Sequence, residues 1–467
     1  MTDEPIMTAA GRPVDRSQPP GPGPVRPFSF PPFQHRELSC GIQVLLARLP
    51  RVPMVTLELY IPAGGQYDPA ELPGLATLTA GMLDEGTRQR SATEIAALVE
   101  QLGGSLITGA GWNAIYASTS ALAKDLPTAV DLAAELVLEP SFPADELERL
   151  RRQRLGDLLQ RRNDPSSLAQ ERFSAAIYGD SPYGRSLIGD ETSAQAITGG
   201  DVRGFYSRHV TAPGTAIVAV GDLDPDALVE HLESAFRSMP RHQPPPMPEI
   251  GPRSLDGVEI HLVHRPQAAQ TEMRVGHVGI SRTHPEYLRL QVLNAILGGK
   301  FTSRINLNLR ERHGYTYGAH SRFIGRFGPG PFQVSSAVET EVAGAAVRET
   351  LGEIRRIQED LVSEEELADT QSYLRGAFVG QLQTIDELSA RLSALALYGL
   401  PADYYERYLR EIETTTREDL LTLARQYLQP ERAVVVLVGP REALEPQVEG
   451  LGEVFVHEPP PKVSNGG

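Results

Sequence analysis

The stretch from Gly74 to Thr87 reads GLATLTAGMLDEGT and is the most informative part of the chain. In a helix, positions 77 and 81 lie one turn apart on the same face, and position 80 lies next to them. A zinc-binding helix commonly places two His ligands at this spacing, with a Glu between them as general base. Here the chain has Thr77, Ala80 and Gly81. A methyl group and a hydrogen atom cannot bind zinc or transfer a proton, and a Thr hydroxyl is a poor ligand, so this stretch cannot form such a site.

A second motif, GGKFTSRINLNLRERHGYTY, runs from Gly298 to Tyr317. Arg310 and Tyr317 are seven residues apart in it (317 − 310 = 7). An Arg guanidinium presents a planar set of donors to carbonyl or carboxylate oxygens, and a Tyr hydroxyl can donate to a developing oxyanion. The residues alone also allow a structural role, in which Arg310 pairs with Glu311 or another acid and Tyr317 packs under a loop.

The composition is that of an acidic globular chain. Its 467 residues are 40% hydrophobic and 22% charged, and the net charge is −16. Binding to nucleic acid is disfavoured, because neutralising phosphates requires a basic face. Such a charge either attracts basic peptides or serves solubility. No apolar run approaches 18 residues, so we expect no membrane-spanning helix.

The ends of the chain and its cysteine content indicate a compartment. The first residues, MTDEPIMTAAGRP, are acidic and lack the apolar run of a secretory signal. Cys40 is the single cysteine, which excludes a disulfide within the chain and fits a reducing environment. We therefore expect a cytoplasmic protein.

Proline-rich segments divide the chain into two parts of similar size. Three consecutive prolines at the centre disfavour a helix and mark a linker. The predicted organisation is a flexible Pro/Gly-rich arm at residues 1–32, a first domain at 33–236, a Pro-rich linker at 237–252, a second domain at 253–450 and a tail at 451–467.

The two domains repeat one pattern. Three segments recur in the same order at nearly constant separation: residues 55–61 with 272–278, 142–147 with 362–367, and 216–221 with 434–439. This regularity indicates a tandem duplication. Alternating strands mix with amphipathic helices, one of which opens with a capping box from Ser91 to Glu94. The predicted fold class is therefore α+β, with helices packed on largely antiparallel sheets in two homologous domains.

Taken together, the two motifs resemble those of the M16 (pitrilysin-type) zinc peptidases. The family's first motif reads roughly GLAHxxEHMLxxGT, and its second reads GGxxSRLxxxLRExxGxxY. The resemblance covers about residues 33–444 and implies the clam-like LuxS/MPP-type metallohydrolase fold. Thr77, Ala80 and Gly81 then mark a degenerate metal site. The family's third ligand, a carboxylate on a later helix, falls on Asp157, which also fits an ordinary solvated helix residue.

The resemblance also implies a division of labour between two chains. In the M16B subgroup, one subunit carries HxxEH, and its partner carries an Arg/Tyr pair that faces the zinc site across a cavity. Arg310 and Tyr317 match this pair, and the short glycine segment at Gly298 favours a bacterial heterodimer over the mitochondrial type. The expected chain is a non-catalytic subunit that has no metal or cofactor of its own. Its partner would bring the HxxEH motif and the zinc ion.

An extended peptide is the substrate that the resemblance implies. It would add as a strand to the edge formed by Ser105, Leu106, Ile107 and Thr108. Two alternatives remain open at this point. In the first, the chain is an inactive structural homologue, like the core subunits of respiratory complexes. In the second, it is a peptide-binding scaffold without hydrolysis. An unorthodox metal site is the third possibility, although His261 and His264 point to opposite faces of a strand and make a poor chelate.

Overall fold

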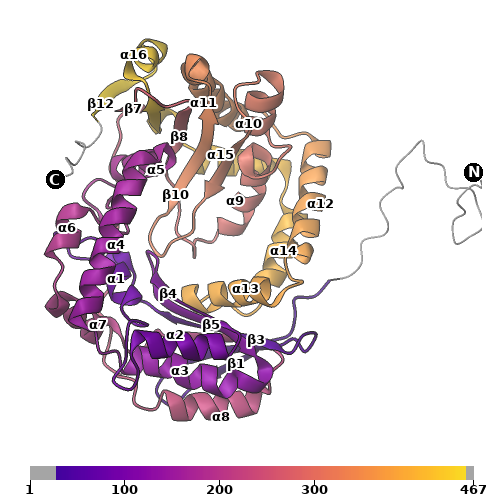
Figure 1. The fold of residues 1–467 in the computed structure, drawn as a ribbon. Helices are drawn as coiled ribbons and strands as arrows, with labels where there is room; N and C mark the ends of the chain where they lie inside the picture. Colours follow the sequence, from indigo (N-terminus) through magenta and orange to yellow (C-terminus); the bar gives the residue numbers. More distant parts are fainter. Residues whose placement is uncertain (1–27, 459–467) are drawn as a thin grey trace, which may run out of the picture. The chain divides into compact units, whose positions relative to one another are not determined.

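Two six-stranded sheets form the framework of the computed structural model, which describes residues 28–458 (Figure 1). The first sheet has the order β1-β2-β6-β3-β5-β4. Its strands are β1 (Gln34–Glu37), β2 (Gln43–Arg48), β3 (Met54–Ile61), β4 (Ser105–Ala110), β5 (Ile115–Leu122) and β6 (Ala216–Gly221). The second sheet has the order β12-β7-β11-β8-β10-β9. Its strands are β7 (Glu259–His264), β8 (Thr271–Val278), β9 (Ala319–Phe323), β10 (Pro331–Val338), β11 (Val434–Gly439) and β12 (Glu453–His457).

Five strands of each sheet repeat one topology, with the order β2-β6-β3-β5-β4 in the first and β7-β11-β8-β10-β9 in the second. The sixth strand differs, because β1 pairs antiparallel with β2 and β12 pairs in parallel with β7. β2 and β6 are parallel, as are β7 and β11, and antiparallel strands continue from β6 to β4 and from β11 to β9. Every residue of the central strands β6 and β11 is buried, which explains their continuous apolar sequences. The α+β prediction with two sheet-and-helix halves is therefore confirmed.

Helices cover both sheets. Those before the linker are α1 (Leu75–Gly81), α2 (Ala92–Gln101), α3 (Leu126–Leu138), α4 (Ala144–Asn163), α5 (Pro165–Tyr178), α6 (Glu191–Ala196), α7 (Gly199–His209) and α8 (Pro225–Ala235). Those after it are α9 (Tyr287–Asn294), α10 (Arg304–Asn306), α11 (Ala343–Glu359), α12 (Glu364–Gly380), α13 (Ile385–Tyr398), α14 (Tyr404–Thr414), α15 (Arg417–Tyr427) and α16 (Arg441–Leu444). The predicted capping box opens α2, where the Ser91 amide donates to Glu94 Oε2 at 2.8 Å.

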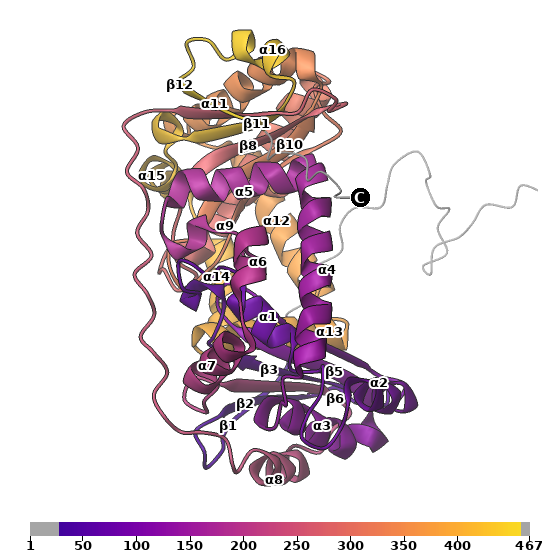
Figure 2. The same cartoon turned by 60° about the vertical axis from the view of Figure 1, so that its left-hand side comes forward.

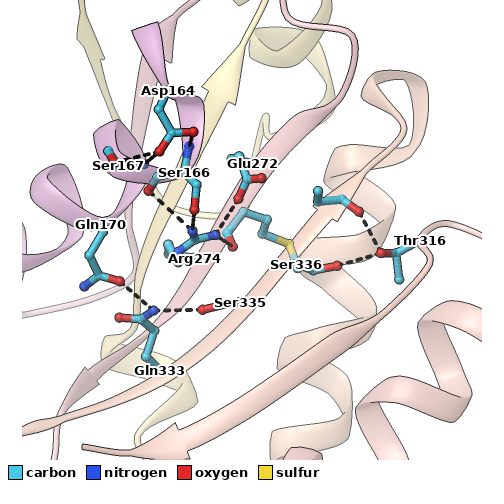
Figure 3. A network of polar contacts seen from close by, with 12 residues as sticks. Asp164, Ser166, Ser167, Gln170, Glu272, Arg274, Thr316, Gln333, Ser335 and Ser336 are labelled. Carbon is cyan, nitrogen blue, oxygen red and sulfur yellow. Dashed lines mark hydrogen bonds and ion pairs between the residues drawn. The ribbon is translucent and has the colours of Figure 1, made fainter. Parts of the chain in front are cut away.

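The two halves exchange a helix. α5 precedes the linker but packs on β8 and β11 of the second sheet, whereas α13 follows the linker and packs on β3 and β6 of the first sheet. Ser166 Oγ of α5 accepts from Arg274 Nη2 at 2.7 Å, and Ser393 Oγ of α13 donates to Glu58 Oε2 at 2.8 Å. Figure 3 shows the first of these contacts within a network that joins α5 to β8 and β10. The halves defined by the sheets are thus interleaved.

The segments outside the two sheets bear on the predicted domain limits. Residues 237–252 contain no helix or strand and run as an extended connection from α8 to β7 (Figure 2). β12 pairs in parallel with β7, so the second sheet extends past residue 450, into the segment for which we predicted a tail. The predicted arm at residues 1–32 and the end of that tail lie largely outside the described residues. Within residues 28–458, no helix is long and apolar enough to cross a membrane.

A buried histidine makes the stability of this fold depend on pH. His277 of β8 accepts the Gln429 amide at Nε2 (3.0 Å), and burial lowers its pKa to about 4. The unfolded chain binds a proton at this group near pH 6.5, so stability is lost as pH falls from 6.5 towards 4. As pH falls over this range, we expect the unfolding free energy of His277→Gln to fall less steeply than that of the parent chain. The difference between the two slopes is up to about 1.4 kcal/mol per pH unit. Urea titrations at several pH values measure it, and an unchanged slope would contradict the assignment; the exposed His35→Gln is the control.

Candidate functional site

The helix with the missing ligands is held at its start by a buried carboxylate. Asp68 accepts from the amides of Gly74 and Ala76, both at 2.7 Å, and so caps α1. Burial raises the pKa of Asp68 to about 7, against the opposing effect of these two hydrogen bonds. Gly74 has φ of +91°, and a Cβ atom there would lie 2.6 Å from the Ile188 carbonyl oxygen. The start of α1 therefore requires glycine.

A guanidinium lies against the face of α1 where a metal ligand would be expected. Thr77 Oγ1 accepts from Arg154 Nη1 at 3.0 Å and lies 2.9 Å from the Gly74 carbonyl oxygen. Arg154 also donates to the Ile188 carbonyl at 2.9 Å. Burial lowers the pKa of Arg154, and the nearby Asp157 and Asp68 oppose this effect. A cation beside Thr77 would be repelled by this group.

The remaining positions of the predicted degenerate site also do not fit zinc. Ala80 is fully buried, and a Cβ atom on Gly81 would meet only Leu150, at 3.7 Å. Asp157 lies on the exposed side of α4 and has no hydrogen bond or ion pair among residues 28–458. Within the same residues, no three His, Cys, Asp or Glu side chains are placed to hold a metal ion. The donor set thus offers zinc no site here.

The predicted peptide-binding residues lie in β4, the outermost strand of the first sheet. β4 pairs only with β5, so its other edge is free within the described chain. Ile107 is 56% exposed, and Thr108 Oγ1 donates to Asp84 at 2.9 Å. A cavity of about 570 Å³ lies beside this strand. Its lining includes apolar residues of α2 and β4, four carboxylates and a single cation: Ile95, Ala96, Val99, Leu106, Asp84, Glu85, Glu100, Glu146 and Arg149.

Arg310 lies in a π-helical turn, η5 (Leu307–Arg312). Such turns occur frequently at functional sites, because they re-aim the side chains that follow. The Arg310 guanidinium carbon lies 4.5 Å from the ring centroid of Phe301, and its Nε lies 3.5 Å from Glu311. The pair with Glu311, which the structural alternative required, is therefore present. It is half-exposed and involves only the Nε atom of Arg310.

Tyr317 extends into solvent from a loop whose backbone is fixed. The loop follows η5, and Tyr317 is 91% exposed, so it does not pack under a loop as the structural alternative required. Thr316 Oγ1 lies 2.6 Å from the Ala337 carbonyl and accepts from Ser336 Oγ at 3.0 Å (Figure 3). The Tyr315 amide donates to the Leu309 carbonyl at 2.8 Å, which ties the loop to η5. Among residues 28–458 the phenol of Tyr317 has no hydrogen-bond partner, while the backbone of its loop is held.

The first two glycines of the second motif, Gly298 and Gly299, serve packing. They end a second π-helical turn, η4 (Ala295–Gly299), which lies against β9. A Cβ on Gly298 would come within 2.4 Å of Ser321 Oγ, and one on Gly299 within 2.6 Å of Asn294 Nδ2. Asn294 and Ser321 are joined by two hydrogen bonds of 3.1 and 2.8 Å. No ligand role is needed to explain these glycines.

Arg154 is a residue of this site that the sequence did not predict. Arg154 is three positions before Asp157, but no local pattern indicates that it reaches Thr77. No hydrogen bond or ion pair within residues 28–458 joins the β4 residues to Arg310 or Tyr317. The two groups therefore form separate parts of a candidate site, one on each half.

Comparisons with known proteins agree with these motifs. Residues 43–191 match the family described as Insulinase (Peptidase family M16), and residues 196–374 match the Peptidase M16 inactive domain. An uncharacterized zinc protease of Mycobacterium tuberculosis is 30% identical over 421 residues, which cover 89% of this chain and 95% of that protein.

Solved structures share the fold. The crystal structure of a peptidase M16 inactive domain from Pseudomonas fluorescens matches with a TM-score of 0.81 at 27% identity, covering 87% of this chain and 98% of that one. A chain of complex III2 from Candida albicans matches with a TM-score of 0.74 at 15% identity, covering 90% and 100%, which shows the fold alone. The sequence matches, the repeated sheet topology and the two motifs lead to one conclusion: the chain belongs to the M16 peptidase family.

Proposed function

We propose that this chain is the non-catalytic, substrate-binding subunit of a heterodimeric M16B zinc peptidase. The observation that carries the proposal is the contrast between its two motifs. The first presents Thr77, which is hydrogen-bonded to the Arg154 guanidinium, and the buried methyl group of Ala80, and this pair of side chains suits no metal. The second presents an exposed phenol at Tyr317, on a loop whose backbone is hydrogen-bonded to the helical turn that carries Arg310. A chain that had lost all function would have no need to hold an exposed Tyr in this way.

The proposed substrate is an extended peptide that pairs with the free edge of β4. Strand addition supplies main-chain hydrogen bonds, and pockets beside the edge select side chains. The cavity next to Leu106 is such a pocket, with an apolar floor from α2. Ile107 lies in the same edge strand and is mostly exposed, so it is available to the peptide.

Arg310 and Tyr317 would act on a peptide whose scissile bond lies at the partner's metal. Arg310 would donate to a peptide carbonyl and hold the backbone in place. Tyr317 would donate a hydrogen bond from its hydroxyl to the oxygen that gains negative charge during hydrolysis. One such donor typically lowers the activation free energy by about 3 kcal/mol. The partner's HxxEH motif would contribute the zinc ion and the general base.

Mixing the purified chain with an HxxEH-bearing M16 subunit tests the proposal. We expect the isolated chain to bind no stoichiometric zinc and to leave a fluorogenic peptide intact, because neither its metal site nor its base is present. We expect cleavage and a stable complex in gel filtration after mixing. An Arg310→Ala variant should lower the rate of the mixture, whereas Arg312→Ala, an exposed neighbour on the same turn, should not. Cleavage by the isolated chain, or none after mixing, would refute the assignment.

A structural role is the second candidate. The fold match to a chain of complex III2 shows that this architecture also occurs in a large assembly. A purely structural subunit would form a stable complex with its partner while Arg310→Ala left every catalytic rate unchanged. The same mixing experiment therefore separates the two functions.

A further inference from the structure

The turn between β9 and β10 inserts a buried cation among aromatic rings. We call residues 324–330 the docking turn. Arg326 in this turn is only 7% exposed. Its guanidinium carbon lies 4.5 Å from the ring centroid of Tyr183, 4.8 Å from that of Trp112 and 5.7 Å from that of Tyr178. These three rings form what we call the aromatic cage.

The cage residues precede the Pro-rich linker in the sequence, and the docking turn follows it. Trp112 lies in the turn between β4 and β5, Tyr178 ends α5, and Tyr183 lies in the short helix η3 (Pro182–Gly184). The rings also contact one another, since the Tyr183 centroid lies 5.4 Å from that of Trp112 and 5.6 Å from that of Tyr178. The backbone N–H of Gln66 donates to the Trp112 carbonyl at 3.1 Å and anchors the β4–β5 turn. The cage residues are therefore also held by contacts that do not involve Arg326.

Arg326 is held by ring faces and not by an acid. Its Nε and Nη1 are buried without a hydrogen-bond partner among residues 28–458, and no ion pair of Arg326 occurs in that part of the chain. A guanidinium over an aromatic face gains about 0.5–2 kcal/mol, which offsets part of its desolvation. Two hydrogen bonds add to the contact: Tyr178 Oη donates to the Pro329 carbonyl at 2.8 Å, and the Gly328 amide donates to Tyr183 Oη at 3.3 Å.

This contact joins the two hairpins that carry the proposed peptide site. The first hairpin contains the edge strand β4 and turns at Trp112. The second turns at Arg326, and its strand β9 begins two residues after Tyr317. β4 and β9 each lie at the edge of a sheet and pair on one side only. An edge strand is held by backbone pairing on one side only, so a contact at its turn further restricts its position.

We propose that Arg326 is a positioning residue: by entering the aromatic cage it fixes the β9–β10 hairpin, and with it Tyr317, relative to β4. The contact itself does not depend on the proposed function. Its effect on hydrolysis does, because that effect is exerted through Tyr317.

The position of the hairpins can be measured without substrate. Spin labels on Ile107→Cys and His320→Cys, both exposed positions, report the distance between β4 and β9 in the full chain. The buried Cys40, the only natural cysteine, is replaced by Ala in this background. We expect a single narrow distance distribution in the parent, and a broader or shifted one in Arg326→Ala. Arg322→Ala, an exposed residue of the same hairpin, should match the parent.

A substitution on the other side of the contact tests the same proposal even if Arg326→Ala fails to fold. Trp112→Ala removes one face of the cage and should broaden the distribution as Arg326→Ala does. The double variant should add nothing further, because both changes break one contact. Arg326→Lys, which keeps the charge without the flat guanidinium, should lie between the parent and Arg326→Ala. Circular dichroism identifies any variant that does not fold.

A kinetic readout separates positioning from general stability. In the complex with an HxxEH-bearing subunit, Arg326→Ala should lower kcat for the fluorogenic peptide by at least about threefold. In a Tyr317→Phe background, the same change should have no further effect on kcat. Distances equal to the parent in Arg326→Ala, or an equal loss of kcat in both backgrounds, would overturn the proposal. If the unmodified mixture cleaves nothing, the proposed function has failed, and the distance measurement alone decides the role of Arg326.

Discussion

In a complex with an HxxEH-bearing subunit, Tyr317→Phe should hydrolyse peptide with a kcat at least about tenfold lower than the parent chain, or about 1.4 kcal/mol in activation free energy. The change removes one hydroxyl and keeps the ring. Tyr317 is almost fully exposed, so the substitution leaves no cavity and no unpaired buried group in this chain. A loss of rate is then attributable to the missing donor.

A second tyrosine provides the control for this experiment. Tyr373 of α12 is half-exposed and lies outside the motif. Tyr373→Phe should leave kcat and KM unchanged. If Tyr317 donates only once charge develops on the substrate oxygen, KM should change little while kcat falls. An undiminished kcat in Tyr317→Phe would exclude the proposed role of the Arg310/Tyr317 pair.

Gly298→Ala should destabilise the chain by about 1–3 kcal/mol. Its new Cβ would lie 2.4 Å from Ser321 Oγ and 2.8 Å from the Ser321 backbone nitrogen. The side-chain oxygen can rotate, but the backbone of β9 cannot move without disturbing its pairing with β10. The helical turn η4 would have to separate from the sheet, because both surfaces are already in contact.

Denaturant unfolding of the chain measures this effect, and a second glycine gives the comparison. Gly156 lies on the exposed face of α4, where a Cβ would meet nothing within 4 Å. Gly156→Ala should stabilise the chain by up to about 1 kcal/mol, since Ala favours the helix. Opposite signs for the two substitutions are the expected result. A neutral Gly298→Ala would show that η4 and β9 can separate freely.

Much of the fold follows from local patterns. The capping box at Ser91 and the unbroken apolar strands β6 and β11 depend on residues within one turn or one strand. The repeat of segments predicted two similar halves, and five strands of each sheet show the same order. β12 was missed: its five residues, EVFVH, lie within the predicted tail, and a strand this short gives little local signal.

The candidate site divides in the same way. The loss of ligands at Thr77, Ala80 and Gly81 is visible in the sequence, as is the spacing of Arg310 and Tyr317. The exposure of Tyr317 was left open, because a Tyr in a loop is equally compatible with packing. Burial depends on the strands and helices that surround the loop, and these come from distant parts of the chain.

Residue types and their spacing were enough to predict the α+β class and the absence of a zinc-binding helix, and to reveal the resemblance to the family that the comparisons then established. Each of these depends on side-chain chemistry within a few residues. The exchange of α5 and α13, the Arg154 guanidinium at Thr77 and the Arg326 contact with Trp112 emerged only in the folded chain. They join residues that lie far apart in the sequence, and no local period or motif records which distant side chains the path of the chain brings into contact.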